Sequence, residues 1–231
     1  MKVSLIIPAL NEEESLPSVL AAIPRTVVND IVVVDNGSSD RTASVASRAG
    51  ARVLSESQKG YGAACWAGFK AAKDADILVF MDADGSFHPG EIPELTAPII
   101  HGDADLVLGT RTLRAEDAHA IPFHARLGNR FIAWLIGFAL PVRTTDLGPF
   151  RAIRRKSLEQ LQMQERTYGW PCEMIIKAGK LDCRIIEVPV SYRRRSGGSS
   201  KVSGTLLGTI GASLSMLKVV ARWSLWSPDS I

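Results

Sequence analysis

A chain of 231 residues with 46% hydrophobic and 22% charged residues can form one α/β domain with a sizeable core, and its composition excludes collagenous and repeat proteins. The formal net charge of +3 is too small to argue for nucleic acid as a partner. Cys65, Cys172 and Cys183 stand at spacings that match no zinc or redox motif, so we expect a reducing, cytoplasmic setting. We expect no signal peptide, because the apolar run 3–7 is short and glutamates follow it at 12–14.

Strands and helices are predicted to alternate through the first half of the chain. Short apolar runs between turn residues indicate buried strands at 3–8, 31–34, 51–54 and 77–81. Helices are predicted from Asn11, which can cap the first one together with Glu14, from the turn 36–40 to Gly50, and over 62–72. This alternation predicts an α/β fold with a Rossmann-like, mostly parallel central sheet flanked by helices on both faces.

The pattern is looser beyond residue 85. We expect a helix over 89–100, a strand over 106–108, an apolar helix over 127–140, a loop over 146–151 and a strand over 185–190. The helix 127–140 has Trp134 and Phe138 on one face, and its length fits a core or interfacial helix. The apolar stretch 205–225 is interrupted by Lys218 and Arg222, so we do not expect it to span a membrane.

Asp82 and Asp84 follow the predicted strand 77–81 directly. Open α/β sheets bind ligands beyond the carboxyl ends of their strands, so both side chains stand where a ligand is expected. Two carboxylates at i and i+2 suit a hard divalent cation such as Mg²⁺, which also binds phosphate oxygens and water. The alternative is a pair of solvated aspartates in an ordinary loop.

Two common nucleotide-binding signatures are missing. The segment 60–65 begins like a dinucleotide fingerprint, but it lacks the third glycine and follows no strong predicted strand. No segment has the glycine-rich, lysine-containing pattern of a phosphate-binding P-loop. A dehydrogenase and a P-loop enzyme are therefore disfavoured.

Five short motifs occur in a characteristic order along the chain, at 8–12, 33–42, 82–84, 109–111 and 195–201. With these motifs the chain resembles the family 2 inverting nucleotide-sugar glycosyltransferases of the GT-A fold. The resemblance is strongest to the dolichyl- and polyprenyl-phosphate mannose and glucose synthases, and it extends from residue 2 to about residue 225. Each motif is weak alone, and their order carries the resemblance.

The resemblance implies a GT-A catalytic domain over residues 1–203 and a C-terminal apolar helix over 204–231. Many relatives continue into transmembrane helices, which we do not expect here. Contact with a membrane would instead be peripheral, through 131–140 and through the C-terminal helix, which has Trp223 and Trp226 near its end. The alternative for the C-terminal helix is ordinary packing against the domain.

For the sugar donor, the resemblance implies a site at the ends of the first, second and fourth strands. Asp35 would accept the imino proton of uracil or guanine, unless it only caps its turn. Asp84 would bind Mg²⁺ or Mn²⁺ directly, with Asp82 reaching the ribose or a metal-bound water. The remaining donor-binding positions implied by the resemblance are Pro8, Leu10, Glu12 and Ala83.

The resemblance implies that Arg111, Arg195 and Lys201 hold the phosphate groups of the donor and of the acceptor. Asp146 is the third expected catalytic residue beside Asp84 and Arg111, and it either contacts the substrate or caps its loop. The loop after Asp146 departs from the family pattern, because it reads Gly-Pro-Phe-Arg at 148–151. Glu173 is a second carboxylate that the resemblance places near the acceptor.

These observations lead to the expectation of a metal-dependent inverting transferase. It would move a hexose from a UDP- or GDP-sugar to a polyprenyl or dolichyl phosphate, at the inner face of a membrane. A lipid phosphate arrives ionised and needs no base. Two alternatives stay open: transfer to a soluble alcohol with Asp146 or Glu173 as the base, and a non-catalytic module that binds nucleotide sugars.

Overall fold

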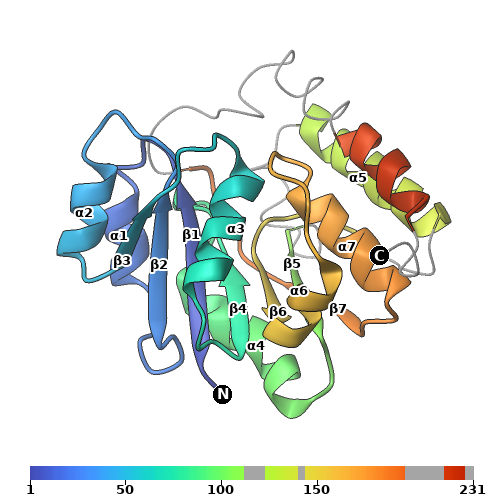
Figure 1. The fold of residues 1–231 in the computed structure, drawn as a ribbon, viewed down its shortest axis with the longest axis horizontal. Coiled ribbons are helices and arrows are strands. Elements are labelled where there is room, and N and C mark those ends of the chain that lie inside the picture. The colour runs from blue at the N-terminus through green and yellow to red at the C-terminus, as the bar shows by residue number, and fades with distance from the viewer. Residues whose placement is uncertain (112–122, 140–143, 196–215, 227–231) are drawn as a thin grey trace.

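The computed structural model describes residues 1–111, 123–139, 144–195 and 216–226. Within them, one mixed sheet of seven strands has the order β3-β2-β1-β4-β6-β5-β7 (Figure 1). The strands are β1 (Val3–Ala9), β2 (Asp30–Asp35), β3 (Arg52–Ser55), β4 (Ile77–Phe80), β5 (Leu106–Thr110), β6 (Arg151–Arg154) and β7 (Ile185–Pro189). Strand β6 runs antiparallel to both of its neighbours, and the other strand pairs are parallel.

Helices cover both faces of the sheet. They are α1 (Leu16–Ala21), α2 (Thr42–Arg48), α3 (Tyr61–Ala71), a 3₁₀ turn at Pro89–Glu91, α4 (Ile92–His101), α5 (Phe123–Ala139), α6 (Arg155–Leu161) and α7 (Trp170–Lys180). The expected mostly parallel α/β sheet between helices is confirmed.

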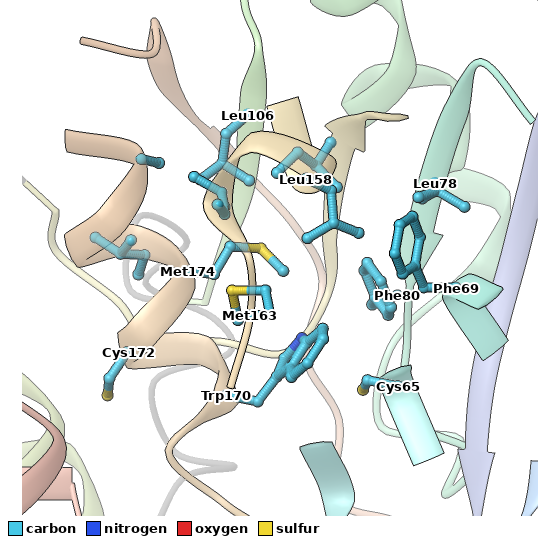
Figure 2. Packing of buried hydrophobic residues seen from close by; sticks show 14 of the residues in the cluster. Cys65, Phe69, Leu78, Phe80, Leu106, Leu158, Met163, Trp170, Cys172 and Met174 are labelled. Carbon is cyan, nitrogen blue, oxygen red and sulfur yellow. The ribbon is translucent and has the colours of Figure 1, made fainter. Parts of the chain in front are cut away.

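The central strand β4 shows why the sheet is buried on both faces. Successive side chains of a strand point to opposite faces, and every residue of β4 is apolar and buried. Leu78 and Phe80 pack into one core with α3, α6 and α7 (Figure 2). Ile77 and Val79 pack into a second core with α1, α2 and α4. Figure 2 shows Phe80 beside Trp170, and the two rings meet edge to face with centroids 6.1 Å apart.

The helix expected from Asn11 is the main local error. Helix α1 begins only at Leu16, and Asn11 adopts a left-handed backbone conformation with φ of 54°. The Asn11 carboxamide oxygen accepts a hydrogen bond from the backbone N–H of Ser39 at 2.8 Å. A contact with the next loop therefore replaces the helix cap that the sequence pattern predicts.

The sequence pattern also misses β6, α6 and α7. The strand predicted at 106–108 extends to Thr110, and the helix predicted at 127–140 is α5, which begins earlier, at Phe123. The helix predicted at 89–100 is divided into a 3₁₀ turn and α4. Residues 146–150 form the expected loop, but Arg151 already belongs to β6.

Residues 216–224, near the C-terminus, form a helix that packs beside α7 (Figure 1). Its buried side chains include Val219, Val220 and Trp223. The Lys177 ammonium of α7 lies 3.9 Å from the centre of the Trp223 ring, and the Lys180 ammonium donates to the Ser224 carbonyl at 2.7 Å. Trp223 thus belongs to the core. Among the helices of the described ranges, none combines the length and apolar character needed to cross a bilayer.

Candidate active site

One edge of the sheet collects the carboxyl ends of β1, β2, β4 and β5. Ala9 pairs with Asp35 in the register of β1 and β2, and β4 leads directly into residues 81–84. This is the edge at which open α/β sheets bind ligands. The predicted site residues that the strand ends and following loops place there are Pro8, Leu10, Glu12, Asp35, Asp82, Ala83, Asp84 and Arg111.

The loops after β1 and β2 hold each other. Asp35 Oδ1 accepts a hydrogen bond from the Ser38 N–H at 2.9 Å, which caps the turn after β2. Ser38 Oγ in turn accepts from the Asn11 N–H at 2.9 Å. Asp35 therefore caps its turn, which is one of its two predicted roles. Its side chain is half-exposed and lies at the edge where the uracil or guanine of the donor is expected.

Glu12, Asp84 and Arg195 form a bonded group at the centre of the edge. One guanidinium nitrogen of Arg195 lies 3.2 Å from Glu12 Oε1 and 3.1 Å from Asp84 Oδ2. The other oxygen of Asp84 accepts from the Ser86 N–H at 2.9 Å. Glu12 Oε2 accepts from the Ser15 hydroxyl at 2.8 Å. The arginine therefore bridges two carboxylates that come from different loops, and the group keeps a net negative charge.

Asp82 lies in the same negative field. Burial is the main cause that raises the pKa of Asp82 to about 7; the charges of Asp84 and Glu12 act in the same direction, and those of Arg111 and Arg195 oppose it. A nearby cation stabilises the ionised form of a carboxylate that other negative charges surround.

This oxygen donor set fits a hard divalent cation. Among the described residues, no group of three or more His, Cys, Asp or Glu side chains is arranged to hold a metal alone. Mg²⁺ and Mn²⁺ sites on diphosphates do not require one, because one or two carboxylates suffice when phosphate oxygens and water complete the shell. Asp82 and Asp84 supply two carboxylates, so the residues present fit the group.

Arg111 and Asp146 form a buried ion pair next to this cluster. The Arg111 N–H and Nε each donate to Asp146 Oδ2 at 2.8 Å, and Nη2 donates to Oδ1 at 2.7 Å. Asn129 of α5 donates to Oδ1 at 2.9 Å. The Asp146 side chain is 0% exposed and that of Arg111 is 15% exposed. Both oxygens of Asp146 are thus already acceptors, and the carboxylate fixes the position of the guanidinium.

The protonation state of the pair follows from this contact. Burial alone would raise the pKa of Asp146, but the charge and hydrogen bonds of Arg111 outweigh it and hold the pKa below its usual value. Burial likewise opposes the charge of Arg111, and Asp146 overcomes this and raises the pKa of Arg111. Asp146 is therefore ionised at neutral pH and is a weak proton acceptor.

The loop that carries Asp146 is held from two sides. Glu187 of β7 accepts hydrogen bonds from the Thr144 hydroxyl at 2.8 Å and from the Thr145 N–H at 2.6 Å. The fully buried Arg151 donates to the carbonyl of Gly148 and, at 3.1 Å, to that of Pro171. The ion pair therefore rests on a loop with satisfied backbone groups.

Tyr192 joins the two halves of the site. Its ring centre lies 5.1 Å from the Arg111 guanidinium carbon and 5.1 Å from the Phe87 ring centre. Phe87 and Tyr192 also form a β-bridge, and the N–H of the following residue, Arg193, donates to the Ser86 carbonyl at 2.8 Å. The segment 191–195 thus runs along the loop after β4 and places Arg195 over Asp84.

Two predicted residues remain, one of them outside the described ranges. Lys201 lies outside the described residues. Glu173 is fully buried in α7, 2.8 Å from the Lys177 ammonium, and it accepts from the N–H groups of Gln164 and Glu165 at 2.8 and 2.6 Å. Glu173 anchors a loop, so it is not placed to act as the base considered for it.

Sequence reasoning missed several residues that support the site. Asn36 accepts from the Gly60 N–H at 2.8 Å and donates to the Gln58 carbonyl at 2.7 Å, which ties the loop after β2 to α3. Asn129 and Glu187 hold the Asp146 loop. Asn129 could have been found from the sequence, because it is a polar residue one turn before Ile132 and Ala133, on the buried face of an apolar helix.

The sequence profile of the glycosyl transferase family 2 matches residues 4–162, so the chain belongs to this family of glycosyltransferases. An uncharacterized glycosyltransferase of Mycobacterium tuberculosis H37Rv is 43% identical over 219 residues, which cover 95% of this chain and 98% of the relative. The undecaprenyl-phosphate mannosyltransferase of Micrococcus luteus is 32% identical over 236 residues, covering 96% of each chain.

The fold has close relatives among solved structures. Glucosyl-3-phosphoglycerate synthase from Mycobacterium tuberculosis, solved with Mn²⁺, UDP and phosphoglyceric acid, superposes with a TM-score of 0.74 and 26% sequence identity. The match covers 99% of this chain and 80% of the synthase. The GT-A fold expected from the sequence motifs is confirmed, and the protein is an enzyme of the glycosyltransferase class.

Proposed function

We propose that the enzyme transfers a hexose from a UDP- or GDP-sugar to a polyprenyl-phosphate-type lipid, with inversion at the sugar carbon. The observation that carries this proposal is the Arg111–Asp146 pair, in which the carboxylate is ionised, buried and fully engaged by its arginine. An alcohol acceptor needs a base to take its proton, whereas a phosphate monoester is already an anion. A site that presents a fixed guanidinium fits the phosphate better.

On the donor side, Asp35 would accept the imino proton of the base, and Pro8, Leu10, Glu12 and Ala83 would line the nucleoside site. Asp82 and Asp84 would hold Mg²⁺ or Mn²⁺ against the diphosphate, and that cation would stabilise the charge of the departing nucleoside diphosphate. The solved relative that contains both Mn²⁺ and UDP supports this assignment.

Arg111, Arg195 and Lys201 would bind phosphate oxygens of the donor and of the acceptor. A guanidinium attracts phosphate oxygens by its charge, which it keeps at all physiological pH values. In this proposal Asp146 acts on catalysis by holding Arg111 in place. The name of the Micrococcus luteus relative, an undecaprenyl-phosphate mannosyltransferase, supports a lipid phosphate as the acceptor.

A lipid acceptor also implies a place of action. The enzyme would work at the inner face of a membrane as a peripheral protein.

A second candidate function is transfer to a soluble acceptor, and the phosphoglyceric acid bound to the Mycobacterium tuberculosis synthase favours it. Both acceptors carry an anionic phosphate group, so both use the same arginines.

The test has two stages. Thermal shifts are first measured with UDP-glucose, GDP-mannose and UDP-N-acetylglucosamine, each with and without Mn²⁺, because a ligand of the folded state raises its stability by mass action. Transfer from the stabilising donor is then assayed with a short-chain polyprenyl phosphate in detergent and with 3-phosphoglycerate in buffer. Transfer to the lipid phosphate supports the proposal, and transfer to phosphoglycerate alone would overturn it in favour of the soluble acceptor.

A further inference from the structure

Helix α5 presents an apolar stripe to solvent. Its side chains at i, i+4, i+7 and i+11 share one face, and they are Leu127, Phe131, Trp134 and Phe138, exposed to 61%, 49%, 59% and 81%. The three rings are stacked in a row, with centroid distances of 6.1 and 5.8 Å and angles of 24° between ring planes. Exposed aromatic rows of this kind mark interaction surfaces.

The fold does not need this stripe. The opposite face of α5 carries Ile132, Ala133 and Ile136, which are buried, and Ile132 and Ile136 join the same core as Trp170 and Val219. Figure 1 shows α5 outside the sheet, beside α7 and the C-terminal helix. Within the described ranges, the helix is therefore held by one face, and its aromatic face is exposed.

The charges of α5 favour an anionic partner. The sequence of the helix contains no aspartate or glutamate, and its two arginines are Arg126 and Arg130. Arg130 is exposed and lies on the flank of the aromatic stripe. Basic residues beside a row of Trp, Phe and Leu are typical of helices that lie in the plane of an anionic membrane surface.

The size of the stripe argues against a second copy of the chain as the occupant. Aromatic side chains contribute roughly 150–250 Å² each, so at these exposures the four side chains offer on the order of 500 Å². Stable protein interfaces bury about 800 Å² on each partner. Insertion into a lipid interface has no such minimum, because each ring gains by its own burial.

The buried face of α5 connects the stripe to the active site. Asn129 donates to Asp146 Oδ1 at 2.9 Å and accepts from the Leu147 N–H at 3.1 Å. Asp146 is bonded to Arg111, so one helix separates the aromatic row from the predicted phosphate-binding arginine. The diameter of a helix is about 10 Å. A surface docked on the stripe would thus lie close to Arg111.

We propose that α5 docks on an anionic bilayer through Leu127, Phe131, Trp134 and Phe138, and that Asn129 transmits its position to the Arg111–Asp146 pair. This inference rests on the proposed transfer to a lipid phosphate and identifies the surface by which the enzyme reaches it. The stripe enters the interface, and Arg130 contacts lipid phosphates beside it.

The experiment is flotation of the full chain with vesicles of phosphatidylcholine, with and without phosphatidylglycerol. We expect binding to the anionic vesicles, and Trp134→Ser and Phe138→Ser to lower the partition coefficient about tenfold each. Ile100→Ser, an exposed apolar residue of α4, and Leu225→Ser, beside the C-terminal helix, are matched controls that should bind as the wild type does. Circular dichroism confirms that each variant is folded.

Each other outcome has a defined meaning. Equal binding of wild type and both α5 variants, or loss of binding only in Leu225→Ser, would overturn the docking surface. A concentration-dependent dimer that Phe138→Ser abolishes, without vesicle binding, would assign the stripe to a second copy and also overturn it. A wild type that transfers hexose to lipid phosphate in detergent but ignores vesicles would refute this inference and leave the proposed function standing. Vesicle binding through α5 without transfer to lipid phosphate would support the docking surface and refute the proposed function.

Discussion

Replacing Asp146 by asparagine tests whether this residue holds Arg111 in place. The amide keeps the shape of the carboxylate and removes its charge, so Arg111 is left with no counter-charge from this partner. Because the Asp146 side chain is 0% exposed and the Arg111 side chain 15% exposed, the charge is uncovered in a buried environment. Breaking a buried ion pair costs about 3–5 kcal/mol, and we expect a loss in this range at pH 7.

The loss is measured by denaturant and thermal unfolding. For a chain of this size it corresponds to a fall in Tm on the order of 10 °C. The matched control is Asp105→Asn, because Asp105 also accepts one backbone and two side-chain hydrogen bonds from one arginine, Arg184, but that side chain is 54% exposed. A second arginine, Arg154, lies 3.5 Å from Asp105, and both of these side chains are also partly exposed, to 24% and 20%. Water screens such a pair, so the control should lose far less stability.

The pH dependence has a definite sign. The pKa of Asp146 is lower in the folded than in the unfolded protein, so its stabilising effect is complete above the ordinary carboxyl pKa of about 3.9. The effect is lost as the pH falls through the lowered pKa of the folded state. The stability difference between wild type and Asp146→Asn should therefore be constant near neutral pH and shrink in acid.

Activity measurements distinguish a positioning role of Asp146 from a role in proton transfer. We expect Asp146→Asn to reduce transfer by on the order of 100-fold through misplacement of Arg111, with the shape of the pH–rate profile near neutrality unchanged. The double variant with Arg111→Met should regain part of the lost stability, since no unpaired charge remains. If Asp146→Asn costs no more stability than Asp105→Asn, the reasoning from burial is refuted.

Three further predictions concern Asp84, Arg195 and Asp82. Asp84→Ala should reduce transfer by at least about 100-fold while Tm stays close to that of the wild type, and unaltered transfer would refute the proposed role of Asp84. Arg195→Ala should strengthen Mn²⁺ binding to the nucleotide-free protein about tenfold or more in calorimetry, because the guanidinium bound to Asp84 no longer competes. Arg194→Ala, which removes an exposed charge of the same segment, is its control, and equal affinities in the two variants would contradict the prediction. Mn²⁺ affinity should also rise with pH through about 7, where Asp82 loses its proton, and a pH-independent affinity would show that Asp82 takes no part.

The sequence predicted those parts of the fold that local pattern determines. The runs at β1, β2 and β4 are apolar, short and bounded by turn residues, and these strands form the centre of the sheet. Strand β6 escaped prediction because its sequence, Arg-Ala-Ile-Arg, is charged at both ends. Arg151 is buried there only because carbonyl groups of the folded 147–148 loop and of Pro171 accept its hydrogen bonds. No sequence pattern encodes partners of that kind.

In the site, too, the sequence predicted which residues take part but not the contacts between them. Motif order placed Glu12, Asp84 and Arg195 in one ligand site, and the structure brings them into contact. Their bonding to each other was not predictable, because Arg195 is 183 residues from Glu12 and 111 from Asp84. Asn11 satisfied the local rule for a helix cap and nevertheless bonds to Ser39, because this tertiary contact outweighed the local preference. Glu173 is held by Lys177, four residues further along the same helix.

The reversed direction of β6 marks the boundary between two differently built halves of the sheet. The four strands β3-β2-β1-β4 are parallel and deliver the predicted donor residues from their carboxyl ends. Beyond them, β6 begins at this edge, so the chain enters the sheet directly from the Asp146 loop. If the proposed function holds, substitutions in α5 and that loop should alter acceptor choice more than donor binding. We expect natural diversification of such enzymes to proceed in this modular way, with one conserved sugar-nucleotide platform and many exchangeable acceptor segments.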